Sequence, residues 1–476
     1  MTSVHPPPGV DREAWSDPRI AADHWARLVP RPGTGLAAQE RTPRGLLLQA
    51  LYPLAGKVPG LRRVPLPIRR VARRSLTRAA VRAHLARCAG TTIVGVTGSS
   101  GKTTTKDLLA AMLAPCGPTL RTRHNDNDLY GVPATLMGIR PSDRFAVVEL
   151  GILERPGEMD WMAGLFRPRV AVLTGVGDDH LPAYGSRAAI AAEKRSLLAR
   201  LGPEGTAVVR AGDRRAARAA GGLGCRVLYA GEGPEAAVRL LDAELRWPHG
   251  MQLTISVRGV EVSTAVALHA RHLAPLVAIA LAAALECGAD VDRALAGLAA
   301  FRPPPGRLQP REGPAGSMFL LDDFKSRRET ALAAVDALAA VPAGRRIVVL
   351  GEVQDRGHDR DTYRPIAASL ERVADRVVAV GRCGPPLRAL LAGSGLEAEF
   401  AAVRDAHAAA AHLEGNLGPG DVLLVHGAAR QHLNRIAMLL DGREVGCRVA
   451  RCTYHWRCDD CPFLATGPPP DRVEAA

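Results

Sequence analysis

A short strand, a glycine-rich loop and the start of a helix follow one another directly between Thr92 and Leu113, in the sequence TIVGVTGSSGKTTTKDLLAAML. The strand is apolar, and the helix carries apolar residues at helical spacing. The loop reads T-G-x-x-G-K-T, which is shorter than the usual phosphate-binding loop, G-x-x-x-x-G-K-[ST]. Both forms place flexible glycines and free backbone N–H groups at a helix N-terminus, where they can surround a polyphosphate. This stretch therefore predicts a nucleotide-binding α/β domain.

The loop supplies the predicted contacts to ATP. Lys102 would lie along the β- and γ-phosphates, and the hydroxyl of Thr103 would bind Mg²⁺. The complete set of predicted ATP-binding residues in the loop is Gly98, Ser99, Ser100, Gly101, Lys102, Thr103 and Thr104. Because motors, kinases, GTPases and ligases all use such a loop, the class of enzyme depends on the residues that follow it.

Near-continuous apolar runs recur along the chain, and such runs are typical of buried parallel strands. Four lie between residues 91 and 212, and four more lie between residues 317 and 427, with helical segments between them. The proline-rich segment 301–314 is predicted to be a hinge between the two groups. The fold class is therefore α/β. We expect a P-loop central domain with a parallel sheet over residues 91–305, and a Rossmann-like α/β domain over residues 306–445.

Residues 1–90 form a basic, proline-rich region. From Leu51 to Gly90 it contains ten Lys or Arg and no Asp or Glu, which supplies most of the net charge of +14. A helix is predicted from Ile68, with apolar and small residues on one face and arginines on another. Such a helix either contacts an anionic membrane through residues 68–88 or presents a solvated arginine face at a domain edge. Nucleic-acid binding is not expected, because no aromatic residues are interleaved with these arginines.

The sequence contains no apolar run of about 18 residues, the length that a membrane-spanning helix needs. The N-terminus, MTSVHPPPGVDREAW, also lacks the charged-then-apolar pattern of a secretory signal. We therefore expect a cytoplasmic protein.

Four cysteines lie within fifteen residues of the C-terminal tail, which we place at residues 446–476: Cys447, Cys452, Cys458 and Cys461. In a reducing compartment four such thiolates suit Zn²⁺ or an iron–sulfur cluster. Their spacing fits no standard zinc-ribbon pattern, so the alternative is a set of free or redox-active thiols.

Seven motifs, in this order, resemble the Mur ligase family over about residues 91–440: TGSSGKTTT, NDNDLYGVPATL, VVELGI, LTGVGDDHL, AAEKRSLL, FRPPPGRLQ and LLDDFKS. Their order and spacing are most similar to those of the members that add D-alanyl-D-alanine to the peptidoglycan precursor. The resemblance implies an ATP- and Mg²⁺-dependent ligase with small-molecule carboxylate and amine substrates. A carboxylate takes the γ-phosphoryl group, and an amine then displaces phosphate from the acyl phosphate. Metal ions and cationic side chains must neutralise the charges of such a transfer.

The resemblance also implies roles for single residues. The Mg²⁺ ligands would be Thr103, Glu149, His180 and, once CO₂ has carbamylated it, Lys194. Arg307 would meet the γ-phosphate from the hinge, and Asp323 would contact the ribose. The substrate contacts would be Asn127, Asp128, Lys325 and Arg327. The residues expected to carry catalysis are Lys102, Lys194, His180 and Arg307. Because the contacts to ATP come from both domains, we expect the hinge to close around the substrates.

Several positions depart from the family pattern. Residues 1–90 show no recognisable UDP-binding domain, and Gly175 and Leu273 stand where the family usually has asparagine. Arg327 and Arg328 replace small and amide residues in the family's D-D-x-Y-N-A-N-P stretch. Two added cations predict an acidic partner, and so a substrate other than the peptidoglycan precursor. Two alternatives stay open: the D-alanyl-D-alanine-adding step itself, and a catalytically degenerate, nucleotide-binding regulatory protein.

Overall fold

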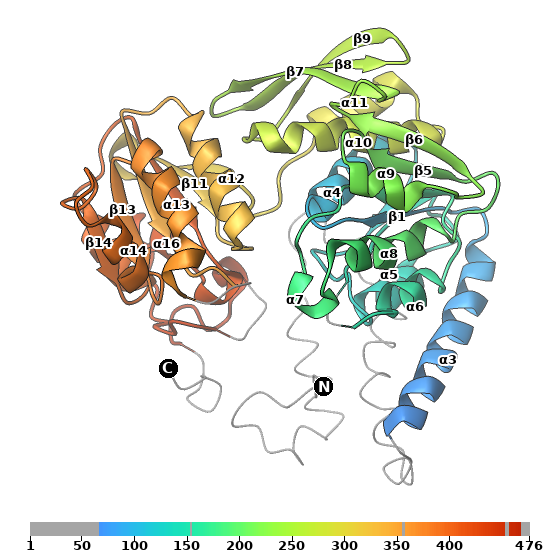
Figure 1. The fold of residues 1–476 in the computed structure, drawn as a ribbon, viewed down its shortest axis with the longest axis horizontal. Coiled ribbons are helices and arrows are strands. Elements are labelled where there is room, and N and C mark those ends of the chain that lie inside the picture. The colour runs from blue at the N-terminus through green and yellow to red at the C-terminus, as the bar shows by residue number, and fades with distance from the viewer. Residues whose placement is uncertain (1–65, 153–154, 355–357, 453–456, 468–476) are drawn as a thin grey trace.

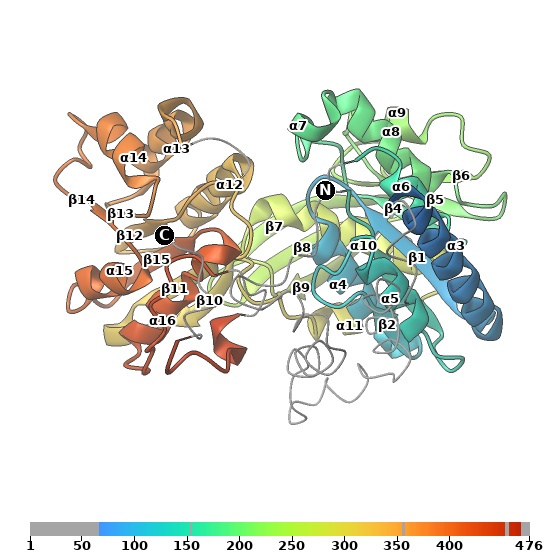
Figure 2. The same cartoon turned by 90° about the horizontal axis from the view of Figure 1, so that it is seen from below.

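The computed structural model describes residues 66–152, 155–354, 358–452 and 457–467, and the expectations for residues 1–65 lie outside the described part. The chain forms two α/β lobes that lie side by side in both views (Figures 1 and 2). Each lobe is built on its own sheet, with helices on both faces.

The sheet of the first lobe has nine strands. In spatial order they are β2 (Thr119–Arg121), β3 (Phe145–Glu149), β1 (Thr92–Thr97), β4 (Val170–Leu173), β5 (Thr206–Arg210), β6 (Arg226–Gly231), β7 (Val238–Arg246), β8 (Gly250–Val257) and β9 (Val260–Val266). Neighbouring strands are parallel from β2 to β7, and β7, β8 and β9 form an antiparallel meander.

Both faces of the parallel part are covered, which explains why its strands are apolar along their whole length. One face packs on α4 (Lys102–Leu113), α10 (Ala274–Glu286) and α11 (Val291–Ala299). The opposite face packs on α5 (Gly131–Gly138), α6 (Glu158–Ala163), α8 (Arg187–Leu198) and α9 (Arg214–Ala220). A single turn, α7 (Leu181–Tyr184), precedes α8. Helix α10 is apolar all round because it is buried from Ala274 to Ala284.

The sheet of the second lobe has six strands. Their spatial order is β10 (Gln309–Glu312), β11 (Met318–Asp322), β15 (Asp421–His426), β12 (Arg345–Leu350), β13 (Arg376–Val380) and β14 (Phe400–Val403). All neighbours are parallel except β10 and β11. One face packs on α12 (Arg328–Ala339), α13 (Arg360–Val373) and α14 (Gly384–Leu391), and the other packs on α15 (Ala406–Leu413) and α16 (Asn434–Leu440).

The predicted α/β class, with a P-loop sheet followed by a Rossmann-like sheet, is confirmed. The eight apolar runs become the parallel strands β1, β3, β4, β5, β11, β12, β13 and β15. Strands β7–β9 were not predicted, because their side chains alternate between buried and exposed and give no continuous apolar run. Part of the predicted hinge is strand β10, which pairs with β11. The limits proposed for the domains, residues 91–305 and 306–445, stay predictions.

Helix α3 (Leu66–Leu85) lies on the outer flank of the first lobe, away from the second lobe (Figures 1 and 2). Its arginines are only partly in solvent: Arg82 is exposed, whereas others pack on the lobe. The guanidinium groups of Arg73 and Arg74 lie over the rings of Tyr130 and Trp161, at 5.8 and 5.4 Å from the ring centroids. In contrast, Leu76 on the apolar side is 71% exposed. Among the described residues, no helix is both long and apolar enough to cross a bilayer.

Candidate active site

The glycine-rich loop turns between β1 and α4, and its two glycines hold the shape of the turn. Gly98 and Gly101 have φ values of +155° and +78°, which side chains rarely adopt. A Cβ on Gly98 would lie 1.9 Å from Oγ1 of Thr174. That hydroxyl belongs to the end of β4 and donates to the carbonyl of Ser100, at 2.5 Å. The loop therefore needs glycine both for its backbone and for its contact with β4.

Lys102 is the first residue of α4. Its Nζ donates to the carbonyl of Gly98 at 2.8 Å and lies 3.9 Å from Oδ2 of Asp179. Burial, together with the nearby cations of Lys325 and Arg327, lowers the pKa of Lys102 to about 7. A polyphosphate at this loop would supply the negative charge that the buried ammonium lacks.

Glu149 ends β3 beside the loop and is fully buried. Its Oε1 accepts hydrogen bonds from Oγ1 of Thr103, at 3.1 Å, and from Nδ2 of Asn127, at 2.6 Å. Its Oε2 has no hydrogen bond from any described residue, and Nζ of Lys106 lies 3.9 Å away. A buried carboxylate oxygen without a donor, next to a hydroxyl, is a set of oxygen ligands that suits Mg²⁺. The residues therefore fit the metal that was predicted from the sequence.

Lys194 lies on α8 and is also fully buried. Its Nζ donates to the carbonyl of Gly98 at 3.0 Å, from the opposite side of the sheet to α4. Burial and the nearby cations of Lys102 and Lys325 hold the pKa of Lys194 well below its usual value. Burial and these cations therefore favour the uncharged amine, which is the form that can react with CO₂.

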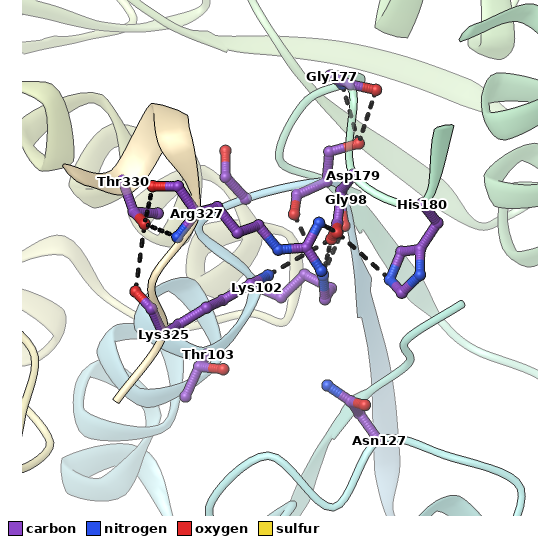
Figure 3. A network of polar contacts seen from close by, with 12 residues as sticks. Gly98, Lys102, Thr103, Asn127, Gly177, Asp179, His180, Lys325, Arg327 and Thr330 are labelled. Carbon is purple, nitrogen blue, oxygen red and sulfur yellow. Dashed lines mark hydrogen bonds and ion pairs between the residues drawn. The ribbon is translucent and has the colours of Figure 1, made fainter. Parts of the chain in front are cut away.

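Asp179 joins the two lobes at the centre of the site (Figure 3). On the first lobe it contacts Lys102 and lies 3.4 Å from Nε2 of His180. From the second lobe, Nζ of Lys325 reaches Oδ2 at 3.5 Å, and the guanidinium of Arg327 pairs with Oδ1. This residue was not predicted from the sequence. The available signal was its place directly before the predicted metal-binding histidine, in GDDHL.

Two further predicted residues lie in the same region, Arg307 in the hinge and Asp323 directly after β11. The guanidinium of Arg307 lies over the ring of Phe324, 4.7 Å from its centroid. Burial lowers the pKa of Arg307, and the carboxylates of Asp322 and Glu149 oppose that shift. Asp323 is 3% exposed and already has a donor at each oxygen: the backbone N–H of Asn434, at 3.1 Å, and Arg457, at 3.2 Å.

Asp128 is used differently from what was expected. Its Oδ1 accepts hydrogen bonds from the backbone N–H groups of Tyr130 and Gly131, at 2.9 and 2.7 Å. This carboxylate therefore closes the turn that leads into α5, and a substrate contact from it stays a prediction.

The cysteines of the tail do not form a metal site among the described residues. Cys447 and Cys458 are buried, and Cys452 and Cys461 are partly exposed. Within the described ranges, no three His, Cys, Asp or Glu side chains are arranged to hold a metal ion. Burial raises the pKa of the Cys458 thiol to about 12, so this thiol stays protonated unless a cation binds it.

Comparison with known proteins places this geometry in a family. The Mur ligase middle domain matches residues 96–284, and the Mur ligase glutamate ligase domain matches residues 306–429. The UDP-N-acetylmuramoyl-tripeptide–D-alanyl-D-alanine ligase of a Synechocystis species is 33% identical over 342 residues, which are 70% of each chain. The chain is a Mur ligase. It is therefore an ATP-dependent enzyme that forms a carbon–nitrogen bond, as the resemblance implied.

Other relatives agree with this assignment. The ligase of the same name from Escherichia coli is 31% identical over 312 residues, which are 65% of this Mur ligase and 68% of that protein. A crystal structure of MurF from Acinetobacter baumannii shares the fold, with a TM-score of 0.71 and 24% identity. The alignment covers 78% of this chain and 81% of that chain.

One departure from the family pattern has a local explanation. Gly175 follows β4 with φ of +141°, a conformation that asparagine rarely adopts. A Cβ there would lie 3.2 Å from Oδ2 of Asp213, which accepts a hydrogen bond from the N–H of Val176. In this Mur ligase, Asp213 therefore holds the backbone at the end of β4.

Proposed function

We propose that this Mur ligase joins a D-alanyl-D-alanine dipeptide to the peptide of a UDP-N-acetylmuramoyl precursor, through an acyl phosphate. The observation that carries the proposal is the convergence of both lobes on Lys102. Thr103, Glu149 and Asn127 lie together on the first lobe, and Lys325 and Arg327 reach the same place from the second. Relatives at 31% and 33% identity carry the name of this activity.

The relatives favour the peptidoglycan precursor over the different acidic partner that the sequence analysis expected. That expectation rested on Arg327 and Arg328 as two uncompensated cations. The carboxylate of Asp179 pairs with Arg327, and Arg328 lies 3.8 Å from Glu329. Because each cation has an acid of this chain beside it, neither one by itself requires an acidic substrate.

The residues suggest the following division of labour. Mg²⁺ bound by Thr103 and Glu149 would withdraw charge from the phosphate oxygens. Lys102 and Arg307 would neutralise the γ-phosphoryl group while a carboxylate oxygen of the precursor attacks it and ADP leaves. The amine of the dipeptide would then attack the acyl carbon, and the carbon–oxygen bond to phosphate would break. The nitrogen loses a proton in that step. Closure of the lobes would keep water away from the acyl phosphate.

Lys194 fits this scheme as a carbamate. The uncharged form of its amine would add CO₂ and release one proton, which replaces a neutral group by an anion. The structure offers two grounds for this: complete burial and a pKa lowered by Lys102 and Lys325. An anion at this position would offset the positive charge of those two lysines. A ¹³C signal of a lysine carbamate after addition of labelled bicarbonate, absent in Lys194→Ala, would test it.

The activity is tested by ADP release from the purified chain with UDP-N-acetylmuramoyl-tripeptide, D-alanyl-D-alanine, ATP and Mg²⁺. We expect release only when all components are present, and a product whose mass equals that of the joined substrates. Release with other acid and amine pairs alone would restore the non-peptidoglycan interpretation. ATP binding without release for any pair would support the regulatory alternative instead.

Two further expectations stay predictions. The four tail cysteines either bind Zn²⁺ or an iron–sulfur cluster in a different arrangement from the one described, or they are free or redox-active thiols. Metal analysis of anaerobically purified protein distinguishes the two. A cytoplasmic location, expected from the sequence, can be tested by fractionation.

A further inference from the structure

The described part of the cysteine-rich tail, residues 446–452 and 457–467, packs on the second lobe, beyond the region that matches the family. Arg435 on α16 is 2% exposed, and its guanidinium donates to the carbonyls of Cys447, at 3.0 Å, and Val449, at 2.6 Å. The backbone N–H of Cys447 in turn donates to the carbonyl of Leu464, at 2.9 Å. A buried arginine that binds several carbonyls fixes the course of the backbone around it. The tail is therefore held in one position on the lobe.

This position brings Arg457 into the hinge. Its NH1 donates to Oδ1 of Asp323 at 3.2 Å, and its Nε lies 3.4 Å from Oδ2 of Asp459. A Cβ on Gly306 would lie 2.5 Å from NH1 of Arg457, and Gly306 has φ of +72°. Asp459 is itself held by Nδ2 of Asn434, at 3.0 Å. The guanidinium is therefore enclosed between the hinge and the loop that follows β11.

Arg457 also decides whether a ligand can reach Asp323. The side chain of Asp323 is 2% exposed, and that of Arg457, which covers it, is 18% exposed. The backbone N–H of Asn434 occupies Oδ2, so Oδ1 is the oxygen that removal of Arg457 would open. A ribose hydroxyl is a neutral donor, and to reach Oδ1 it would have to take the place of the charged guanidinium that lies against it.

We propose that Arg457 is an internal competitor of the nucleotide: it occupies the place on Asp323 that the ribose takes, and so sets the affinity of the site for ATP. The inference rests on the proposed function and on the ribose contact of Asp323, which the resemblance to the Mur ligases implies. It adds that a residue of the tail determines the affinity for the nucleotide sugar. Binding of ATP then requires that Arg457 leave Asp323, which it can do by turning toward Asp459.

The test compares two nucleotides in three forms of the full-length chain. Isothermal titration calorimetry with Mg²⁺ measures the Kd of ATP and of 2′,3′-dideoxy-ATP, which lacks the ribose hydroxyls. The forms are the unaltered chain, Arg457→Ala and the matched control Arg443→Ala. Arg443 precedes the same tail segment and lies 3.7 Å from Asp459, but has no contact with Asp323 in the described structure. Thermal unfolding verifies that each form is folded, and Arg457→Gln replaces Arg457→Ala if the latter unfolds.

We expect the Kd of ATP to fall about tenfold in Arg457→Ala, the size of one hydrogen bond to a charged group. The Kd of dideoxy-ATP should stay within about twofold, because that nucleotide cannot use Oδ1. Arg443→Ala should change neither value. An unchanged or higher Kd of ATP in Arg457→Ala would overturn the inference, and so would an equal gain for both nucleotides. Failure of the unaltered chain to bind either nucleotide would instead count against the proposed function.

Discussion

The two lobes bring charged residues to the same site, but they hold them in different ways. In the first lobe, Gly98, Lys102 and Thr103 lie in one continuous stretch, and the turn from β1 into α4 sets their positions. In the second lobe, Asp323 and Arg327 also lie in one loop, after β11. Their partners come from far along the chain, since Asp179 is on the other lobe and Arg457 is on the tail.

The difference shows what a motif can determine. A phosphate-binding loop works through its own backbone, so its sequence already contains its geometry. The loop after β11 presents long, charged side chains, and each needs an opposite charge that its own segment does not contain. For such a loop, the function of a residue depends on the partner that the fold supplies.

The largest expected effect is a loss of kcat, and it should differ between a residue of the first lobe and a residue of the second. We expect Lys102→Ala to lower kcat for ADP release about 10²- to 10³-fold, the size typical of a lost transition-state contact. Lys325→Ala should lower it only about tenfold, because Arg327 reaches the same carboxylate of Asp179. Steady-state ADP release with saturating substrates measures both. Equal losses in the two variants would contradict the division between a self-contained loop and a shared one.

Asp179 allows a more specific test of the comparison, because its carboxylate on the first lobe pairs with Lys325 and Arg327 of the second lobe. We expect Asp179→Asn and Arg327→Ala each to lower kcat/KM about tenfold, and the double variant to cost little more than either alone, since both remove one interaction. Asp178→Asn is the control. The carboxylate of Asp178, next to Asp179 in the sequence, pairs with Arg187 within the first lobe, so this variant should keep kcat/KM within about twofold. Additive losses in the double variant would show that Asp179 and Arg327 act separately.

The pH dependence of nucleotide binding gives a smaller, few-fold effect. Phosphates bind the cation of Lys102, whose pKa in the free protein is about 7. Below pH 7 the ammonium is already present. Above it, binding must take up a proton, so the affinity for ADP should fall as pH rises from 7 to 8. Calorimetry at pH 8 in two buffers of different ionisation enthalpy measures the uptake, expected to approach one proton.

Arg327 links this pH dependence to the second lobe. Its cation lowers the pKa of Lys102, so Arg327→Ala should raise that pKa and move the fall in affinity to higher pH. Proton uptake at pH 8 would then decrease. An identical pH profile with and without Arg327 would mean that the lobes are electrostatically independent.

The fold could be predicted as far as the sequence repeats a local pattern. Apolar runs gave the parallel strands, and Gly98 and Gly101 marked the turn into α4. Strands β7–β9 were missed because alternation over one half-buried face is a weaker signal than a continuous run. In the site, Glu149 accepts hydrogen bonds from Thr103 and Asn127, and the roles that the resemblance implies for the three residues stay predictions.

The partners of the charged residues could not be predicted in the same way. Nothing near Arg327 in the sequence indicates that Asp179 faces it, because 148 positions and a hinge separate them. Asp323 likewise meets Arg457 only because Arg435 anchors the tail. Such pairs depend on how the two lobes, or the lobe and the tail, pack against each other. A single sequence does not show which distant residues this packing brings into contact.

Helix α3 extends the comparison beyond the site, with the smallest expected effect. Local periodicity predicted the helix, but not that Arg73 and Arg74 would pack on the distant rings of Tyr130 and Trp161 while Leu76 is exposed. If residues 68–88 contact an anionic membrane, Leu76→Glu should weaken cosedimentation with phosphatidylserine vesicles a few-fold, since the rest of the exposed face is mostly alanine. Val260→Glu, on the β8–β9 hairpin and 66% exposed, should not change it. Equal binding to neutral vesicles, or an equal loss in both variants, would show that the outward apolar face of α3 has no part in membrane contact.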